Sequence, residues 1–213
     1  MNFKVLFMDN RNIQEELSSI RNLMERSSKF ISLSGMSGVL AGIYALVGAY
    51  AGYRIVYPNI FTLSYRNHYV NESEVMLKLV LVAIAVLTAS IATGIWFSMK
   101  KAKRHHQQIW NLSSQNLLVS MSVPLLTGGA FIIIMLFKGF FILVAPACLL
   151  FYGLSLVAGS HYTFKDVKWL GISEIALGLL AAAFPGYGLI FWALGFGILH
   201  IVYGAVMHFK YDR

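Results

Sequence analysis

The sequence predicts an all-α membrane protein: a polytopic bundle of six transmembrane helices in three hairpins, preceded by a short amphipathic helix. Three observations lead to this prediction. Hydrophobic residues make up 58% of the 213 residues and charged residues 12%, about half the charged fraction of a typical soluble domain. Six apolar runs come close to or exceed the roughly 20 residues that cross a bilayer as a helix. Lys and Arg gather in the segments that six spans would place on one side of the membrane.

The chain divides into two expected units, an N-terminal cytoplasmic helix in residues 1–30 and a transmembrane domain in residues 31–213. In the first unit, apolar residues recur at spacings of three and four, which is typical of an amphipathic helix. They are Ile13, Leu17, Ile20 and Met24, with Asn12 and Glu15 as a capping pair. Such a helix either lies on the membrane surface or binds a partner helix.

The expected spans begin and end at turns and charged residues. They cover residues 31–53, 75–98, 117–137, 140–159, 169–184 and 189–208. In the first span, small residues fall on one helical stripe, and Leu46 lies off that stripe. Small residues let helices approach closely in a membrane, so we expect Ser34, Gly38, Gly42, Gly197 and Gly204 to serve helix packing.

The distribution of basic residues predicts the orientation. With both termini in the cytoplasm, thirteen of the 17 Lys and Arg residues lie on the cytoplasmic side, as the positive-inside rule expects of a multi-pass protein. The densest run is Lys100, Lys101, Lys103 and Arg104, which we expect to contact anionic phospholipid head groups. A protein-docking role for this run is the alternative. The same bias accounts for the net charge of +8 without nucleic acid as a partner.

The last two hairpins resemble each other. Phe137-Lys138-Gly139-Phe140 and Phe184-Pro185-Gly186-Tyr187 stand at their turns, and each is followed by Tyr-Gly, at Tyr152-Gly153 and Tyr203-Gly204. Two such hairpins in parallel orientation indicate a duplication. About the last 90 residues also resemble uncharacterised bacterial six-pass proteins and the hairpin repeats of HdeD-type membrane proteins. This resemblance implies a non-enzymatic inner-membrane protein linked to acid or envelope stress, and it implies no catalytic residue.

No catalytic, cofactor or metal motif is present. The chain lacks Gly-x-Ser-x-Gly, His-Glu-x-x-His and phosphate-loop signatures. His161 and Asp166 have the His-x4-Asp spacing that resembles the acid/base pair of phospholipid acyltransferases, so an enzyme with this site is one alternative. Six histidines raise the question of a metal or haem, but no pair has the i, i+4 spacing, and we predict neither. Cys148, the single cysteine, has no disulfide partner within the chain.

The best functional candidate is an intramembrane polar pair, Glu174 and His200, which either closes the last hairpin as a structural contact or acts as a proton-sensitive switch or relay. Both lie thirteen positions from Tyr187, the centre of the last hairpin, so antiparallel helices place them at the same depth. A mid-membrane carboxylate costs about 2.5–3.5 kcal/mol on an insertion scale, which favours a partner. We expect flanking glycines to bring the two helices together: Gly171 and Gly178 beside Glu174, and Gly197 and Gly204 beside His200.

The sequence therefore favours a non-enzymatic membrane protein that acts through protein partners or through the state of the membrane, in a stress response or in regulation. A protein partner or a second copy of the chain is the expected interaction besides the bilayer. The first alternative is a small-solute or proton-coupled transporter or channel, because repeated hairpins and buried ionisable residues are transporter features. A continuous polar path to Glu174 would favour transport, whereas a closed apolar bundle would favour the partner role.

Overall fold

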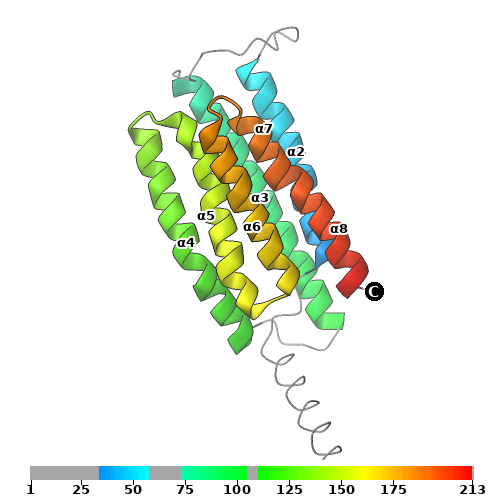
Figure 1. Cartoon of the computed structure of the whole chain (residues 1–213). Coiled ribbons are helices and arrows are strands. Elements are labelled where there is room, and N and C mark those ends of the chain that lie inside the picture. Colours follow the sequence, from blue (N-terminus) through cyan, green and yellow to red (C-terminus); the bar gives the residue numbers. More distant parts are fainter. Residues whose placement is uncertain (1–33, 58–72, 105–109, 213) are drawn as a thin grey trace, which may run out of the picture.

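The computed structural model describes residues 34–57, 73–104 and 110–212, and this part of the chain is helical throughout apart from short turns. The expected N-terminal amphipathic helix and the first loop lie outside the described residues. The helices run antiparallel in one bundle (Figure 1). They are α2 (Gly35–Val56), α3 (Ser73–Arg104), α4 (Leu112–Phe137), α5 (Val144–Gly159), α6 (Lys165–Ala183), and a last rod of α7 (Gly188–Trp192), η3 (Ala193–Leu199) and α8 (His200–Tyr211).

The predicted all-α bundle of six helical rods is confirmed. Five of the rods are long and apolar enough to cross a membrane. The sixth, α6, has 19 residues and carries Lys165, Asp166, Lys168 and Glu174, so its sequence is less apolar than that of the others. It nevertheless runs beside α5 along the bundle (Figure 1).

The two ends of the described chain meet at one end of the bundle. The Ser34 hydroxyl donates to the Asp212 carboxylate at 3.2 Å, which joins the start of α2 to the end of α8. This end is called the Asp212 end below. The opposite end carries the turns between α4 and α5 and between α6 and α7, and is called the Gly139 end. The described chain therefore runs along the bundle an even number of times.

The two turns of the repeated hairpins share a backbone feature. Gly139 and Gly186 have φ angles of +76° and +94°, a left-handed conformation that side chains rarely adopt. The glycines at equivalent positions of the sequence repeat therefore have the same conformational role at both turns. At the other end of the first of these hairpins, Asn111 caps α4 by accepting from the Ser114 amide at 2.8 Å.

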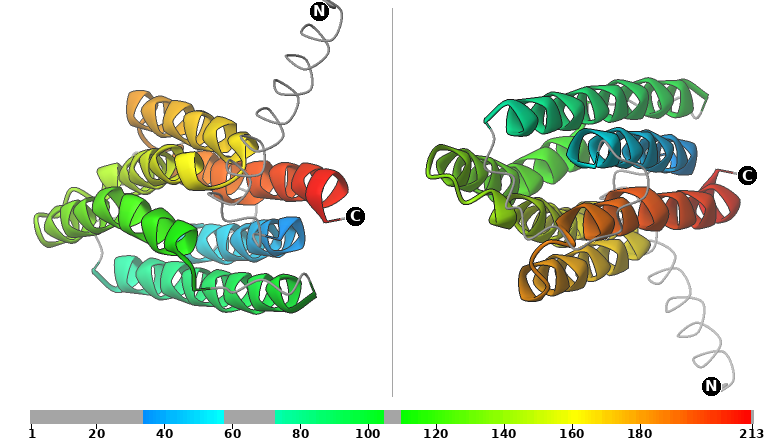
Figure 2. Two further views of the ribbon diagram at one scale, coloured as in Figure 1. Left: turned by 90° about the horizontal axis from the view of Figure 1, so that it is seen from below. Right: turned by 90° about the horizontal axis from the view of Figure 1, so that it is seen from above.

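Glycines allow two helix pairs to pack at close range. α5 crosses α6 where Gly153 faces Gly171: a Cβ added to Gly153 would lie 2.6 Å from the Gly171 carbonyl oxygen. α2 packs against η3 and α8 in the same manner. Seen end on, α3 lies at the edge of the bundle beyond α2 (Figure 2), and among the described helices it packs substantially against α2 only. Most large apolar side chains of α3 are therefore exposed, as expected beside lipid.

Candidate functional site

Glu174 and His200 meet in the middle of the bundle. The Glu174 Oε1 atom lies 3.4 Å from His200 Nδ1. Glu174 belongs to α6 and is 0% exposed, while His200 opens α8 and is 8% exposed. The two candidates that the sequence singled out thus lie together, and both are buried.

A third residue, Tyr152 of α5, completes the site. Its hydroxyl lies 2.8 Å from His200 Nε2, and His200 Nδ1 lies 3.0 Å from the Gly195 carbonyl oxygen. A carbonyl only accepts hydrogen bonds, so Nδ1 carries the hydrogen and a neutral ring accepts from the Tyr152 hydroxyl at Nε2. Both ring nitrogens are therefore occupied. In the sequence, Tyr152 stands out only as part of the repeated Tyr-Gly pair. That repetition is the one feature of the sequence that could have drawn attention to it.

Glu174 has unused hydrogen-bonding capacity. Neither carboxyl oxygen has a hydrogen-bond partner among the described residues, although both are fully buried. His200 approaches Oε1, but its Nδ1 hydrogen is already directed to Gly195. Leaving a buried polar group unsatisfied costs about 1–3 kcal/mol, and more when the group is charged. The buried Glu174 carboxyl group thus lowers the stability of the fold. Buried ionisable groups that do so are typical of functional sites.

Gly195 is the residue that lets the carboxyl group lie here. It belongs to the π-helical segment η3, a rare geometry that is frequently found at functional sites. A Cβ at Gly195 would lie 2.5 Å from Glu174 Oε2 and 2.5 Å from the Leu149 side chain. Any larger residue would displace the carboxyl group, and sequence reasoning did not identify this glycine.

The expected role of the flanking glycines in closing the last hairpin is wrong. Gly171 and Gly178 of α6 face Gly153 and Leu150 of α5 instead. The other two glycines, Gly197 and Gly204, face α2. The glycine faces of α6 and α8 therefore pack against α5 and α2, respectively. Each of these two contacts is more extensive than the contact between α6 and the last rod.

The helix-packing candidates lie at the interface of α2 with the last rod. A Cβ at Gly38 would lie 3.2 Å from the Gly204 Cα atom, and a Cβ at Gly42 would lie 2.6 Å from the Gly197 carbonyl oxygen. Ser34 instead bonds Asp212. The expectation that Leu46 stands apart from this interface is wrong, because a Cβ added to Gly197 would lie 2.4 Å from Leu46 Cδ2.

Asp212 ties three helices together at its end of the bundle. Its carboxylate accepts from Lys101 Nζ at 2.6 Å and from the Gly35 amide at 2.9 Å, and lies 3.2 Å from His208 Nδ1. Burial alone would raise the pKa of Asp212, but hydrogen bonds from Lys101 and His208 hold it below its usual range. Lys101, expected at the lipid surface, thus turns inward, whereas the other three basic residues expected there are exposed: Lys100, Lys103 and Arg104.

The His161 and Asp166 alternative lacks the expected geometry. Asp166 accepts from Lys210 Nζ at 2.9 Å and from the Tyr211 hydroxyl at 2.6 Å. Burial would raise the pKa of Asp166, but these hydrogen bonds lower it overall. The carboxylate therefore joins α6 to α8, while His161 is exposed in the turn before α6. Within the described ranges no three His, Cys, Asp or Glu residues gather in a way that could hold a metal ion.

The comparisons with known proteins add no relative. No protein-family model, curated protein or solved structure matches this chain.

Proposed function

We propose that the chain is a non-enzymatic protein of the bacterial inner membrane that responds to protons through Glu174, His200 and Tyr152. One observation carries this proposal: a fully buried carboxyl group without a hydrogen-bond donor among the described residues lies 3.4 Å from an imidazole nitrogen. Histidine is the side chain that ordinarily changes charge between about pH 5 and 8. An ionisable residue inside a membrane domain is by default a functional candidate.

The hydrogen on His200 Nδ1 has two possible acceptors, the Gly195 carbonyl oxygen and the Glu174 carboxylate. His200 Nδ1 lies 3.0 Å from the Gly195 carbonyl and 3.4 Å from Glu174 Oε1. When Glu174 is protonated, the Nδ1 hydrogen stays on Gly195. When Glu174 loses its proton, the carboxylate attracts the Nδ1 hydrogen and competes with the Gly195 carbonyl. Proton binding thus alters the hydrogen bonding of η3.

A change in η3 would reach the rest of the bundle through α2. The same segment contains Gly197, whose carbonyl faces Gly42 at close range. Interfaces packed this tightly adopt discrete arrangements rather than deforming continuously. The titratable groups that face Glu174 are His200 from α8 and, through His200, Tyr152 from α5. The proposed switch therefore depends on these three side chains.

The orientation is proposed from the charge distribution. Among the described residues, the Asp212 end carries seven Lys and Arg residues and the Gly139 end three. The positive-inside rule assigns the Asp212 end to the cytoplasm. The exposed residues of that end, including Lys100 and Arg104, are then available to anionic phospholipids or to a partner protein. The resemblance to HdeD-type hairpins would place such a proton response in acid or envelope stress.

Transport is the second candidate. A cavity at the Gly139 end is lined by Trp192, whose ring lies 5.5 Å from that of Phe196. Phe196 in turn lies 5.2 Å from Tyr152, so a chain of aromatic contacts leads from the cavity wall to the polar centre. Opening of these rings would create a path toward Glu174. In the present closed arrangement, no residue of the polar centre lines the cavity, which favours a response to protons over their passage.

The test is hydrogen–deuterium exchange of residues 193–200 in reconstituted vesicles between pH 5 and 8, after correction for the intrinsic pH dependence of exchange. We expect the corrected protection of this segment to change with pH in the natural protein and to stay constant in Glu174→Gln. Glu74→Gln is the matched control, because Glu74 is 79% exposed at the side chain and pairs with Lys78. An unchanged response in Glu174→Gln would overturn the proposal. If vesicles with the natural protein show a proton flux that is absent in Glu174→Gln, transport is the function instead of the proposed proton response.

A further inference from the structure

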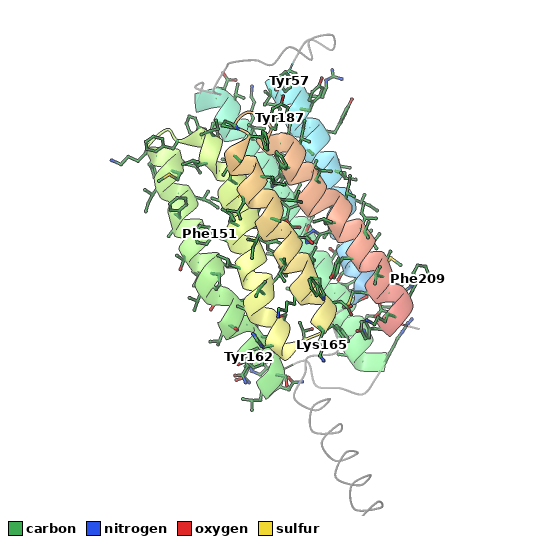
Figure 3. The ribbon with its side chains drawn as sticks, viewed as in Figure 1. Tyr57, Phe151, Tyr162, Lys165, Tyr187 and Phe209 are labelled. Carbon is green, nitrogen blue, oxygen red and sulfur yellow. The ribbon has the colours of Figure 1, made fainter. Side chains whose placement is uncertain are left out.

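A cavity of about 400 Å³ at the Gly139 end plays no part in the proton response proposed above. Its walls come from α2, α3, α5 and α7 and from the two hairpin turns. Tyr57, one of its lining residues, and Tyr187 both lie at this end of the bundle (Figure 3). The volume falls within the roughly 300–1,000 Å³ of ligand-binding pockets.

The chemistry of the wall is apolar. No Asp, Glu, Lys, Arg or His belongs to the described lining, which consists of aliphatic, aromatic and glycine residues with Met76, Cys148 and Pro185. Apart from the thiol, its polar side-chain groups are the Tyr57 hydroxyl and the Trp192 indole N–H. A water molecule in a cavity needs two to four polar partners, and apolar cavities stay dry. An unfilled cavity also forfeits the dispersion contacts of its walls. This wall therefore favours an apolar occupant over water or a polar solute.

The cavity adjoins the part of the bundle that is least closed. Met76, Val80 and Ala83 of α3 line one side, and Val144 and Cys148 of α5 line another. Of the described helices, α3 packs substantially against α2 alone, so it makes no extended interface with α5. An apolar chain can enter between these two helices from the surrounding lipid.

The depth of the cavity matches one leaflet of a bilayer. Along α2 the lining extends from Val56 to Gly48, a separation of eight residues. At about 1.5 Å per residue this is roughly 12 Å, and half of a hydrocarbon core of about 30 Å is roughly 15 Å. We propose that the cavity holds one acyl chain of a phospholipid from the leaflet at the Gly139 end. The head group then stays at the rim, where Lys138 precedes the lining residue Gly139.

This site is separate from the polar centre. Trp192 forms part of its wall, whereas Tyr152, Glu174 and His200 do not, and the Phe196 ring contacts both Trp192 and Tyr152. Loss of lipid binding would therefore leave the proton response intact, and the reverse also holds. The two proposals can fail independently.

Quenching of Trp192 by brominated acyl chains tests the proposal. The other three tryptophans are at least 60% exposed and can be replaced by Phe: Trp96, Trp110 and Trp169. Vesicles contain phosphatidylcholine with a bromine-labelled acyl chain at increasing mole fraction. We expect a quenching component that saturates at a low fraction of labelled lipid. Quenching that only follows the bulk lipid fraction would mean annular lipid only and would overturn the proposal.

A pair of variants on α3 separates the cavity from the lipid-facing surface. Ala83→Phe fills the cavity and should abolish the saturable component. Ala85→Phe adds the same ring at a second exposed alanine that does not line the cavity, and should leave the component unchanged. Val80→Phe is a second filling variant, used if the thermal melting of Ala83→Phe departs from that of Ala85→Phe. Saturable quenching retained in both filling variants would refute the site.

Discussion

The packing of α2 against the last rod predicts that a single methyl group at Gly42 destabilises the bundle. A Cβ there would lie 2.6 Å from the Gly197 carbonyl oxygen, 2.6 Å from Ile201 Cγ1 and 2.9 Å from the Ile201 amide nitrogen. Two of these atoms are backbone, so the helices themselves must separate. Overpacking costs about 1–3 kcal/mol, and Ala gains about 0.5–1 kcal/mol over Gly in a helix. We expect Gly42→Ala to lose about 1–2 kcal/mol of net unfolding free energy.

Gly129→Ala on α4 is the control, because a Cβ at Gly129 meets nothing within 4 Å. This variant receives the helix-propensity gain without the clash and should be stabilised by about 0.5–1 kcal/mol. The assay is unfolding in mixed micelles with increasing sodium dodecyl sulfate, followed by far-UV circular dichroism. Gly42→Ala and Gly129→Ala of equal stability would refute the close packing of α2. Val47 is 63% exposed, so truncation of its side chain to Ala should cost little stability on α2.

Three further predictions follow from the two ends and the centre of the bundle. Tyr152→Phe removes the hydroxyl that bonds His200 and should cost about 0.5–1.5 kcal/mol of unfolding free energy in the same assay, with Tyr50→Phe as an exposed control. The lowered pKa of Asp212 means that its bonds stabilise the fold above the unfolded pKa of about 3.9, and that this stability is lost as pH falls through the folded value. The melting temperature of the natural protein should thus fall more steeply below about pH 4 than that of Asp212→Asn, and parallel curves would contradict the Asp212 contacts. Reporter fusions after Met99, Ser160 and Arg213 should be cytoplasmic and a fusion at Asn67 external, and an external Arg213 fusion would contradict the even number of spans.

Much of the fold could be predicted because the membrane leaves few options. Apolar runs of sufficient length must become helices, since backbone groups have no other partners in hydrocarbon. The depth of Glu174 and His200 followed from helix rise and a turn at Tyr187 alone. The small residues Gly38 and Gly42 were informative because small side chains in membrane helices mark close contacts.

The neighbours of each helix were harder to predict. A glycine stripe indicates close approach but not to which helix, and the stripes of α6 and α8 face α5 and α2. Gly195 could not be identified, because the π-helical segment shifts the register that a regular helix would give to residues 193–199. Lys101 was misplaced for a similar reason: its partner Asp212 lies 111 residues away in the chain.

The central claim, that Glu174 binds and releases a proton inside the membrane, is tested most directly by infrared difference spectroscopy of the reconstituted protein. Spectra are recorded between about pH 5 and 8, the range in which a histidine-linked switch works. We predict a change in the carboxylic acid C=O stretch that disappears in Glu174→Gln and persists in Glu74→Gln. A spectrum without this change, or with the same change in Glu174→Gln, would contradict the claim.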